Sequence, residues 1–221
     1  MPDRLALGVL LSGSGTNLQA LIDAIAAGRL HARIAVVISN VPDAGGVERA
    51  RRHGLTVRAL PHRDAPTREA YDAQIVEILR AHGVELVVLA GFMRLVTPVL
   101  LAAYPLRVVN VHPALLPAFP GLHAERQAIA HGARLTGVTV HFVDEETDHG
   151  PILAQAAVPV FADDTEESLH ARIQRQEHRL YPFAIQLIAE GRVRIEGRRV
   201  VIDGGASAPG ACLANPDPSS S

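Results

Sequence analysis

The alternation of short apolar runs with longer segments of helical period constrains this fold more than any other feature of the chain. Residues 5–11 (LALGVLL) are an apolar run of strand length, and residues 17–27 then place apolar side chains at helical spacing before Gly28. The same change of period recurs further along the chain, and a run that is apolar throughout is typical of a strand covered on both faces. We therefore predict an α/β protein with a doubly wound, mostly parallel sheet and helices on both faces.

The remaining elements follow from the same patterns. Strands are expected at 34–39, 56–60, 85–90, 106–111, 135–143 and 152–158, and helices around 48–53 and at 67–82, 124–130 and 165–190, where Pro182 is a candidate kink. Residues 193–195 and 200–202 flank a Glu-Gly-Arg turn and are expected to form a closing C-terminal β-hairpin. Pro113, Pro117 and Pro120 exclude a regular helix or a central strand between the strand at 106–111 and the helix at 124–130.

Composition sets the size of the folded unit. A chain of 221 residues that is 48% apolar can bury enough surface as one domain to be stable without disulfides or metal. We expect this domain to span residues 1–203, because the chain beyond it consists mainly of small residues and prolines. Residues 204–221 are predicted to be a disordered tail, which carries the single cysteine, Cys212, so that no intrachain disulfide is possible.

Charge and hydropathy argue against several classes of function. The 21 Lys and Arg nearly balance the 23 Asp and Glu, and the scattered basic residues do not form the stripe that nucleic-acid binding requires. The N-terminus has no signal segment, and no apolar run approaches the roughly 18 residues of a membrane-spanning helix. We expect a cytoplasmic protein that acts on small molecules, with no nucleic-acid or membrane partner, as a monomer or a weak homodimer.

Residues 12–17 (SGSGTN) join the first predicted strand to the first predicted helix. A helix N-terminus presents free N–H groups and the positive end of the helix dipole, and glycine lets an anion approach the backbone. This pattern favours a phosphate site, although a tight turn with a Ser or Thr helix cap has the same signature. The segment lacks the lysine that a Walker A loop requires. Leu18 and Asn40 occupy the positions at which a dinucleotide-binding fingerprint has a glycine and an acidic residue. A phosphorylated substrate is therefore favoured over a nucleotide cofactor.

Asn110 and His112 lie two residues apart at the end of a predicted strand, so their side chains should point the same way. Ligands bind at this edge of open α/β sheets, and an amide beside an imidazole is a candidate oxyanion-binding pair. Asp148, in a later acidic turn, is the candidate carboxylate that would favour the imidazolium form, which can donate a proton. A hydrogen-bonded core histidine and a solvated acidic loop are the alternative interpretations.

Two other kinds of chemistry are disfavoured. The side chains that could bind a metal here are His112, His141, Asp148 and His149. No His-Glu-x-x-His or paired-cysteine spacing is present, so no metal is expected. His141 either lines the site or fills a polar position in the core. The segment 13–15 (GSG) is too short for the Gly-x-Ser-x-Gly motif of a serine nucleophile.

In combination, several segments resemble the glycinamide ribonucleotide formyltransferase family over about residues 5–203. They are LLSGSGTNLQAL at 10–21, TREAYD at 67–72, VVLAGFMRLV at 87–96, NVHPALLPAFPGLHAERQA at 110–128, DHGPILAQ at 148–155 and QEHRLYP at 176–182. One such match can arise by chance, but the whole set in this order is specific. Ala118 and His149 depart from the family pattern, which commonly has a polar or basic residue and a glycine at these positions, and His149 is expected to restrict the backbone beside Asp148.

The resemblance implies transfer of the formyl group of 10-formyltetrahydrofolate, as co-substrate, to the amino group of 5-phosphoribosyl-glycinamide in de novo purine biosynthesis, without a metal. It assigns catalysis to Asn110, His112 and Asp148. It assigns the nucleotide to Gly15, Thr16, Asn17 and Glu177. It assigns the folate pocket to Arg68, Met93, Arg94, Leu95, Val96 and Asn110.

Three rival functions follow from the same motifs. A hydrolase that releases formate from the same folate would use a similar Asn, His and Asp set, and such relatives usually carry an N-terminal regulatory domain before the first strand. A formyltransferase for initiator tRNA would need a basic surface and an RNA-binding domain. A non-catalytic folate or nucleotide binding module would keep the loop and the pocket without needing the Asn-x-His pair and Asp148.

Overall fold

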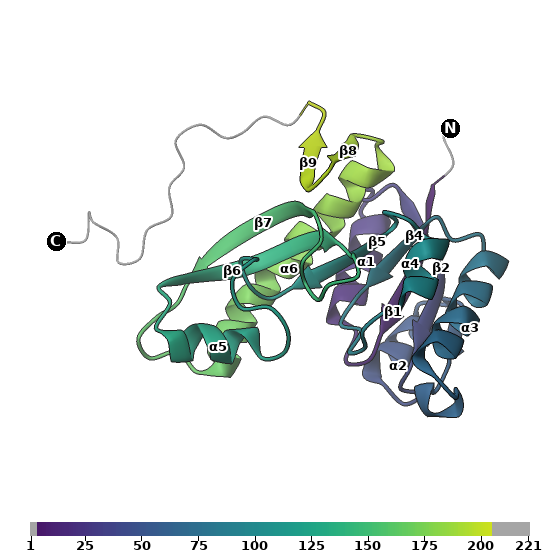
Figure 1. Cartoon of the computed structure of the whole chain (residues 1–221), viewed down its shortest axis with the longest axis horizontal. Coiled ribbons are helices and arrows are strands. Elements are labelled where there is room, and N and C mark those ends of the chain that lie inside the picture. Colours follow the sequence, from purple (N-terminus) through teal and green to yellow (C-terminus); the bar gives the residue numbers. More distant parts are fainter. Residues whose placement is uncertain (1–3, 205–221) are drawn as a thin grey trace.

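The computed structural model describes residues 4–204, and its main feature is a seven-stranded sheet (Figure 1). The strands are β1 (Leu5–Leu11), β2 (Ala32–Ser39), β3 (Val57–Ala59), β4 (Leu86–Leu89), β5 (Val108–His112), β6 (Leu135–Phe142) and β7 (Ile152–Pro159), in the spatial order β3-β2-β1-β4-β5-β6-β7. The pairs from β3 to β5 are parallel, and β6 and β7 are antiparallel. The prediction of a mostly parallel sheet is therefore confirmed.

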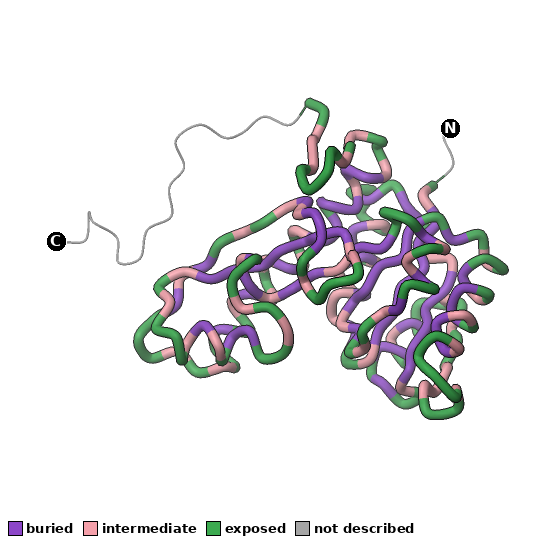
Figure 2. The backbone as a smooth tube through the Cα atoms, viewed as in Figure 1, coloured by how far each residue is buried: buried purple, intermediate pink, exposed green. Residues whose placement is uncertain are grey.

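Helices cover both faces of this sheet. They are α1 (Thr16–Ala26), α2 (Gly45–Arg52), α3 (Arg68–Ala81), α4 (Pro98–Ala103), α5 (Ala124–His131) and α6 (Glu166–Ala189), with a 3-10 turn at His62–Asp64. One apolar core includes residues of α1, α2 and α6, and the other includes residues of α3 and α4. Figure 2 shows the strand interiors buried between these layers, as the continuous apolar runs predict.

Two helices differ from the sequence-based expectations. The patterns did not predict α4, because its six residues are too few to display a helical period, although Pro98 at its first turn is a known start signal. Helix α2 begins at Gly45 rather than near residue 48, because Gly46 packs closely on the loop after β1 and donates a hydrogen bond of 2.9 Å to the Gly13 carbonyl. Helix α6 continues through Pro182 without a break.

The order of the strands places the candidate site. β1 pairs with β2 on one side and with β4 on the other, so the strand order reverses at β1. The crevice beyond the carboxyl ends of such strands is where open α/β sheets bind ligands. The loops after β1, β4 and β5 all leave the sheet at this edge, and they carry most of the residues that the sequence singled out.

The C-terminal hairpin is present as predicted, with β8 (Val193–Glu196) paired antiparallel to β9 (Arg199–Ile202) (Figure 1). Apart from Gly204, the tail predicted at 204–221 lies outside the described residues. Within residues 4–204, no helix combines the length and the apolar character needed to cross a membrane.

Candidate functional site

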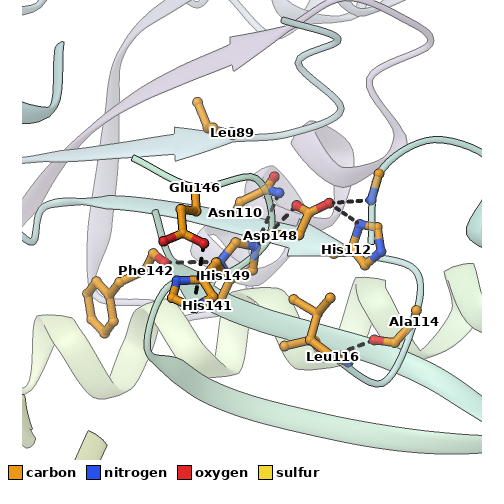
Figure 3. A network of polar contacts seen from close by, with 12 residues as sticks. Leu89, Asn110, His112, Ala114, Leu116, His141, Phe142, Glu146, Asp148 and His149 are labelled. Carbon is orange, nitrogen blue, oxygen red and sulfur yellow. Dashed lines mark hydrogen bonds and ion pairs between the residues drawn. The ribbon is translucent and has the colours of Figure 1, made fainter. Parts of the chain in front are cut away.

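Asn110, His112 and Asp148 lie together at the end of β5, and Figure 3 shows their side chains pointing toward one another. His112 is the last residue of the strand and is 4% exposed. Its Nδ1 atom lies 3.3 Å from Oδ2 of Asp148, which comes from the loop between β6 and β7. The structure thus brings together the three residues that the sequence proposed as a set.

Both ring nitrogens of His112 face acceptor oxygens. Nδ1 faces the carboxylate of Asp148 at 3.3 Å, and Nε2 lies 2.8 Å from the carbonyl oxygen of Phe119. The Nε2 contact is a hydrogen bond, and the Nδ1 contact is an ion pair when the ring is protonated. These two contacts hold the ring from both sides and leave it few degrees of freedom.

The Asp148 carboxyl is held in its ionised form. Burial alone would raise its pKa, but the interaction with the His141 ring, the hydrogen bond from the Gly121 N–H and the charge of His112 together lower the pKa below its ordinary value. The Gly121 N–H donates to Oδ2 at 2.8 Å. Asp148 also has a backbone φ of 52°, which side-chain-bearing residues rarely adopt. Its position is therefore fixed by contacts on several sides.

His141 lines the same site. It pairs directly with Asn110 across the antiparallel β5 and β6 strands, and it is 1% exposed. Its Nε2 atom lies 3.4 Å from Nδ2 of Asn110 and 3.7 Å from Oδ1 of Asp148. Of the two roles left open by the sequence, the structure supports contact with the site.

The sequence did not reveal the main-chain groups that hold this cluster. The Phe119 carbonyl and the Gly121 N–H belong to the proline-containing segment after β5, where the only signal was that a fixed, irregular backbone was needed. Side-chain motifs cannot identify such groups, because every residue supplies a carbonyl and every residue except proline supplies an N–H.

The four residues assigned to a nucleotide gather at the N-terminus of α1. We call residues 12–17 the nucleotide loop. Gly15 occupies the N-cap of α1 with φ 73°, and Thr16 and Asn17 form the first turn of the helix. Asn17 Nδ2 donates to Oε2 of Glu177 on α6 at 3.1 Å. Glu177 is 6% exposed, and its burial raises the pKa of the carboxyl, an effect that the bond from Asn17 partly offsets.

Gly15 is required for two reasons that a pair of variants can separate. Gly15 has a left-handed backbone conformation with φ 73°, and an added Cβ would lie 2.6 Å from the Cα of Gly46. Gly28 has a similar conformation, with φ 69°, but nothing lies within 4 Å of an added Cβ. We expect Gly28→Ala to lower the free energy of unfolding by about 1–2 kcal/mol through the left-handed backbone alone. Gly15→Ala should cost at least about 1 kcal/mol more, because backbone atoms must move apart.

Urea denaturation of the two variants measures this difference. Equal losses in Gly15→Ala and Gly28→Ala would show that the approach of Gly15 to Gly46 has no energetic role. A change of denaturation midpoint without a change of slope is needed for the comparison to hold.

Four of the six residues assigned to folate, Met93, Arg94, Leu95 and Val96, follow β4, whereas Arg68 lies on α3 and Asn110 on β5. We call residues 91–97 the folate segment. Its apolar side chains Met93 and Leu95 are 66% and 56% exposed. The guanidinium of Arg94 lies 5.0 Å from the centre of the Tyr71 ring on α3, and the Thr97 N–H donates to the buried Asp72 carboxylate at 2.6 Å. The segment is therefore fastened to α3 while it presents apolar side chains to solvent.

Arg68 is the first residue of α3 and is exposed, so its guanidinium stands free of the core at the start of the helix that holds the folate segment. Val96 is partly buried and packs against the core on the α3 face of the sheet.

The two departures from the family pattern lie outside the buried cluster. Ala118 is exposed, and its side chain contributes no polar group. Nδ1 of His149 lies 3.0 Å from Oδ2 of Asp144, and the His149 carbonyl accepts a hydrogen bond of 2.6 Å from Arg198 in the hairpin turn. Across residues 4–204, no three His, Cys, Asp or Glu side chains are grouped so that they could hold a metal ion.

Comparison with known proteins identifies relatives of this chain. The family model described as formyl transferase matches residues 6–185. Phosphoribosylglycinamide formyltransferase of Escherichia coli (strain K12) is 44% identical over 196 residues, which cover 89% of this chain and 92% of that protein. The crystal structure of glycinamide ribonucleotide transformylase 1 from Symbiobacterium toebii is 55% identical with a TM-score of 0.90, covering 91% of this chain and 95% of that chain.

The fold is shared with an enzyme that is described as having a different activity. A formyltetrahydrofolate deformylase from Pseudomonas syringae pv. tomato is 27% identical with a TM-score of 0.84, covering 91% of this chain and 66% of that chain. Since the family model matches most of the chain and a protein of nearly the same length is 44% identical, the chain belongs to the formyl transferase family.

Proposed function

We propose that this chain is a phosphoribosylglycinamide formyltransferase, which transfers the formyl group of 10-formyltetrahydrofolate to the amino group of 5-phosphoribosyl-glycinamide in de novo purine biosynthesis. The observation that carries the proposal is the buried pair of His112 and Asp148 beside Asn110, at the sheet edge where the nucleotide loop and the folate segment also lie. Relatives with this activity match nearly the full length of the chain.

In the mechanism that we propose, the substrate amine attacks the formyl carbon and a tetrahedral oxyanion forms. Asn110 donates a hydrogen bond to this oxygen through its amide, and His112 donates one as an imidazolium, through the Nε2–H that leaves the Phe119 carbonyl. Asp148 keeps His112 charged and, through a water molecule, passes the proton of the attacking amine to the leaving nitrogen of the folate. A carbon–nitrogen bond to the amine forms, the bond to the folate nitrogen breaks, and the products are the N-formyl amide and tetrahydrofolate.

Each substrate is proposed to occupy its own side of this centre. The N-terminus of α1 at Gly15, Thr16 and Asn17 would hold the phosphate, because free N–H groups and the helix dipole converge there. The buried carboxylate of Glu177, already oriented by Asn17, would accept hydrogen bonds from ribose hydroxyl or glycinamide groups.

On the other side, the pterin would lie on the folate segment with main-chain groups bonding its edge. The exposed apolar side chains there support this placement, because an apolar surface with a few polar groups is typical of a site for a flat organic ligand. The folate-binding residues in this proposal are Arg68, Met93, Arg94, Leu95, Val96 and Asn110.

Both substrates are small molecules. We propose that the enzyme works in the cytoplasm as one domain over residues 1–203, as a monomer or a weak homodimer, without a metal and without a nucleic-acid or membrane partner. The near balance of 21 basic and 23 acidic residues supports a small-molecule rather than a nucleic-acid substrate.

Loss of formyl-folate, followed by absorbance with and without the glycinamide nucleotide, tests the proposal. We expect consumption only when the nucleotide is present, with one formylated product for each tetrahydrofolate formed. Free glycinamide at the same concentration should be a much poorer acceptor, because it lacks the phosphate that the nucleotide loop would bind.

Two outcomes would contradict the proposal. Formate release without the amine would assign the chain to the hydrolase class, to which the deformylase with the same fold belongs. Binding of folate or nucleotide with no turnover would assign it to a binding module.

A further inference from the structure

Ser12, the first residue of the nucleotide loop, contacts the folate segment, and the proposed function assigns these two parts of the chain to different substrates. It follows β1 directly. The Ser12 hydroxyl accepts a hydrogen bond of 2.8 Å from the Met93 N–H, and the Ser12 N–H donates one of 3.0 Å to the Gly91 carbonyl. The first residue of the nucleotide loop is therefore bonded twice to the folate segment.

The orientation of the Ser12 hydroxyl is fixed from the opposite side. It donates its hydrogen to Oδ1 of Asn40 at 2.6 Å, and Asn40 is only 6% exposed. Nδ2 of Asn40 in turn lies 3.4 Å from Nδ1 of His62. Because the hydroxyl hydrogen is directed to Asn40, a lone pair of the oxygen is left to receive the Met93 N–H. Ser12 thus forms a directed polar bridge rather than a free surface hydroxyl.

The folate segment has one side-chain anchor at each end. Near its exit, the Asp72 carboxylate on α3 receives the Thr97 N–H at 2.6 Å. Near its entry, the Ser12 hydroxyl receives the Met93 N–H. Only the second anchor belongs to the loop that would bind the other substrate. The nucleotide loop and the backbone beside Met93 therefore share a direct hydrogen bond.

We propose that Ser12 is a positioning residue that couples the nucleotide site to the folate site. When a phosphate orders the nucleotide loop, the Ser12 bridge favours the backbone conformation of the folate segment that receives the folate. Thermodynamic linkage requires the reverse effect to be equally large. This inference rests on the proposed function, and it assigns Ser12 no contact with the reacting atoms, because Asn40 and Met93 occupy its hydroxyl.

Calorimetric binding to wild type and Ser12→Ala tests the coupling. The probes are the glycinamide nucleotide and tetrahydrofolate, which form a ternary complex without reacting. In wild type, each ligand should tighten the binding of the other by the same factor. In Ser12→Ala this factor should fall by roughly fivefold toward one, the loss expected for one hydrogen bond to a main-chain group. The KM for 10-formyltetrahydrofolate should rise by a similar factor, while kcat at saturation stays within about twofold.

Ser39→Ala is the matched control. Ser39 is a fully buried serine at the end of the neighbouring strand β2, and its hydroxyl bonds only to the main chain of Val41, at 2.7 Å to the carbonyl and 3.2 Å to the N–H. This variant should keep the wild-type coupling factor whatever it does to stability. Asn40→Ala, which removes the acceptor that orients the Ser12 hydroxyl, should lower the factor and carries the test if Ser12→Ala does not fold.

Two results would overturn the inference. In the first, the wild-type protein binds both ligands but neither ligand tightens the binding of the other. In the second, Ser12→Ala keeps the coupling factor of the wild-type protein. Wild type that fails to bind the nucleotide or the folate would instead refute the proposed function, so the two failures are distinguishable.

Discussion

Replacing His112 with alanine is expected to lower kcat by about 100- to 1000-fold while the KM values of both substrates stay within about threefold of wild type. The Asp148 carboxylate holds the ring from the Nδ1 side. In the proposed mechanism the Nε2–H, which faces the Phe119 carbonyl at 2.8 Å, turns to the oxyanion as it forms. An interaction made only in the transition state changes kcat and leaves ground-state binding intact. Steady-state kinetics with each substrate varied in turn measures this split.

Two further variants sharpen the result. Asn110→Ala removes the second proposed donor and should give a loss of similar size, and the double variant should lose less than the product of the two, because both groups act on one oxygen. His82→Ala removes a histidine that bonds the Ile78 carbonyl at the end of α3, at 2.7 Å, and should keep kcat within about twofold. A His112→Ala enzyme with kcat within tenfold of wild type would remove His112 from the proposed mechanism.

Local patterns were sufficient to predict most of the elements. The strand at Leu5–Leu11 and the hairpin of β8 and β9 follow from periods of a few residues, which are set by side-chain geometry alone. The two-residue spacing of Asn110 and His112 likewise predicted that they point the same way, and both lie beside Asp148 (Figure 3). These features depend on neighbours in the chain, and they are therefore readable from sequence.

Features that depend on partners distant in sequence could not be predicted. His141 reaches the site because β6 runs antiparallel to β5, which no local pattern reports. The approach of Gly15 to Gly46 and the bond from Met93 to Ser12 depend on how two loops pack. The resemblance to a family supplied residue roles at such places, but the contacts that would produce those roles required coordinates.

Asp148→Asn is expected to lower kcat by about 100-fold near neutral pH. The substitution preserves shape, and the remaining side-chain oxygen can still accept the Gly121 N–H. It removes the negative charge that faces Nδ1 of His112 at 3.3 Å. The neutral carboxamide can neither pair with the ring nor take part in the proposed proton transfer. Steady-state kinetics with each substrate varied in turn measures the loss, and the KM values should stay within about threefold of wild type.

Stability should depend on pH in a direction that follows from the lowered pKa of Asp148. A carboxyl whose folded pKa lies below its unfolded value of about 3.9 stabilises the fold above that value, and the contribution is lost as the pH falls through the folded pKa. The contribution of Asp148 to the difference in unfolding free energy between wild type and Asp148→Asn should therefore shrink as the pH falls below about 3.9. A difference that grows in acid would mean that the carboxyl is destabilised in the fold.

Asp144→Asn separates the charge of Asp148 from the general acidity of its loop. Asp144 belongs to the same loop but pairs with His149 at 3.0 Å, and both side chains are substantially exposed. Screening by solvent makes such a pair contribute little at the buried ring of His112, so this variant should keep kcat within about twofold of wild type. If Asp144→Asn and Asp148→Asn lower kcat equally, the overall charge of the acidic loop is what the reaction needs. If only Asp148→Asn lowers kcat, the reaction needs the contact between Asp148 and His112 at 3.3 Å.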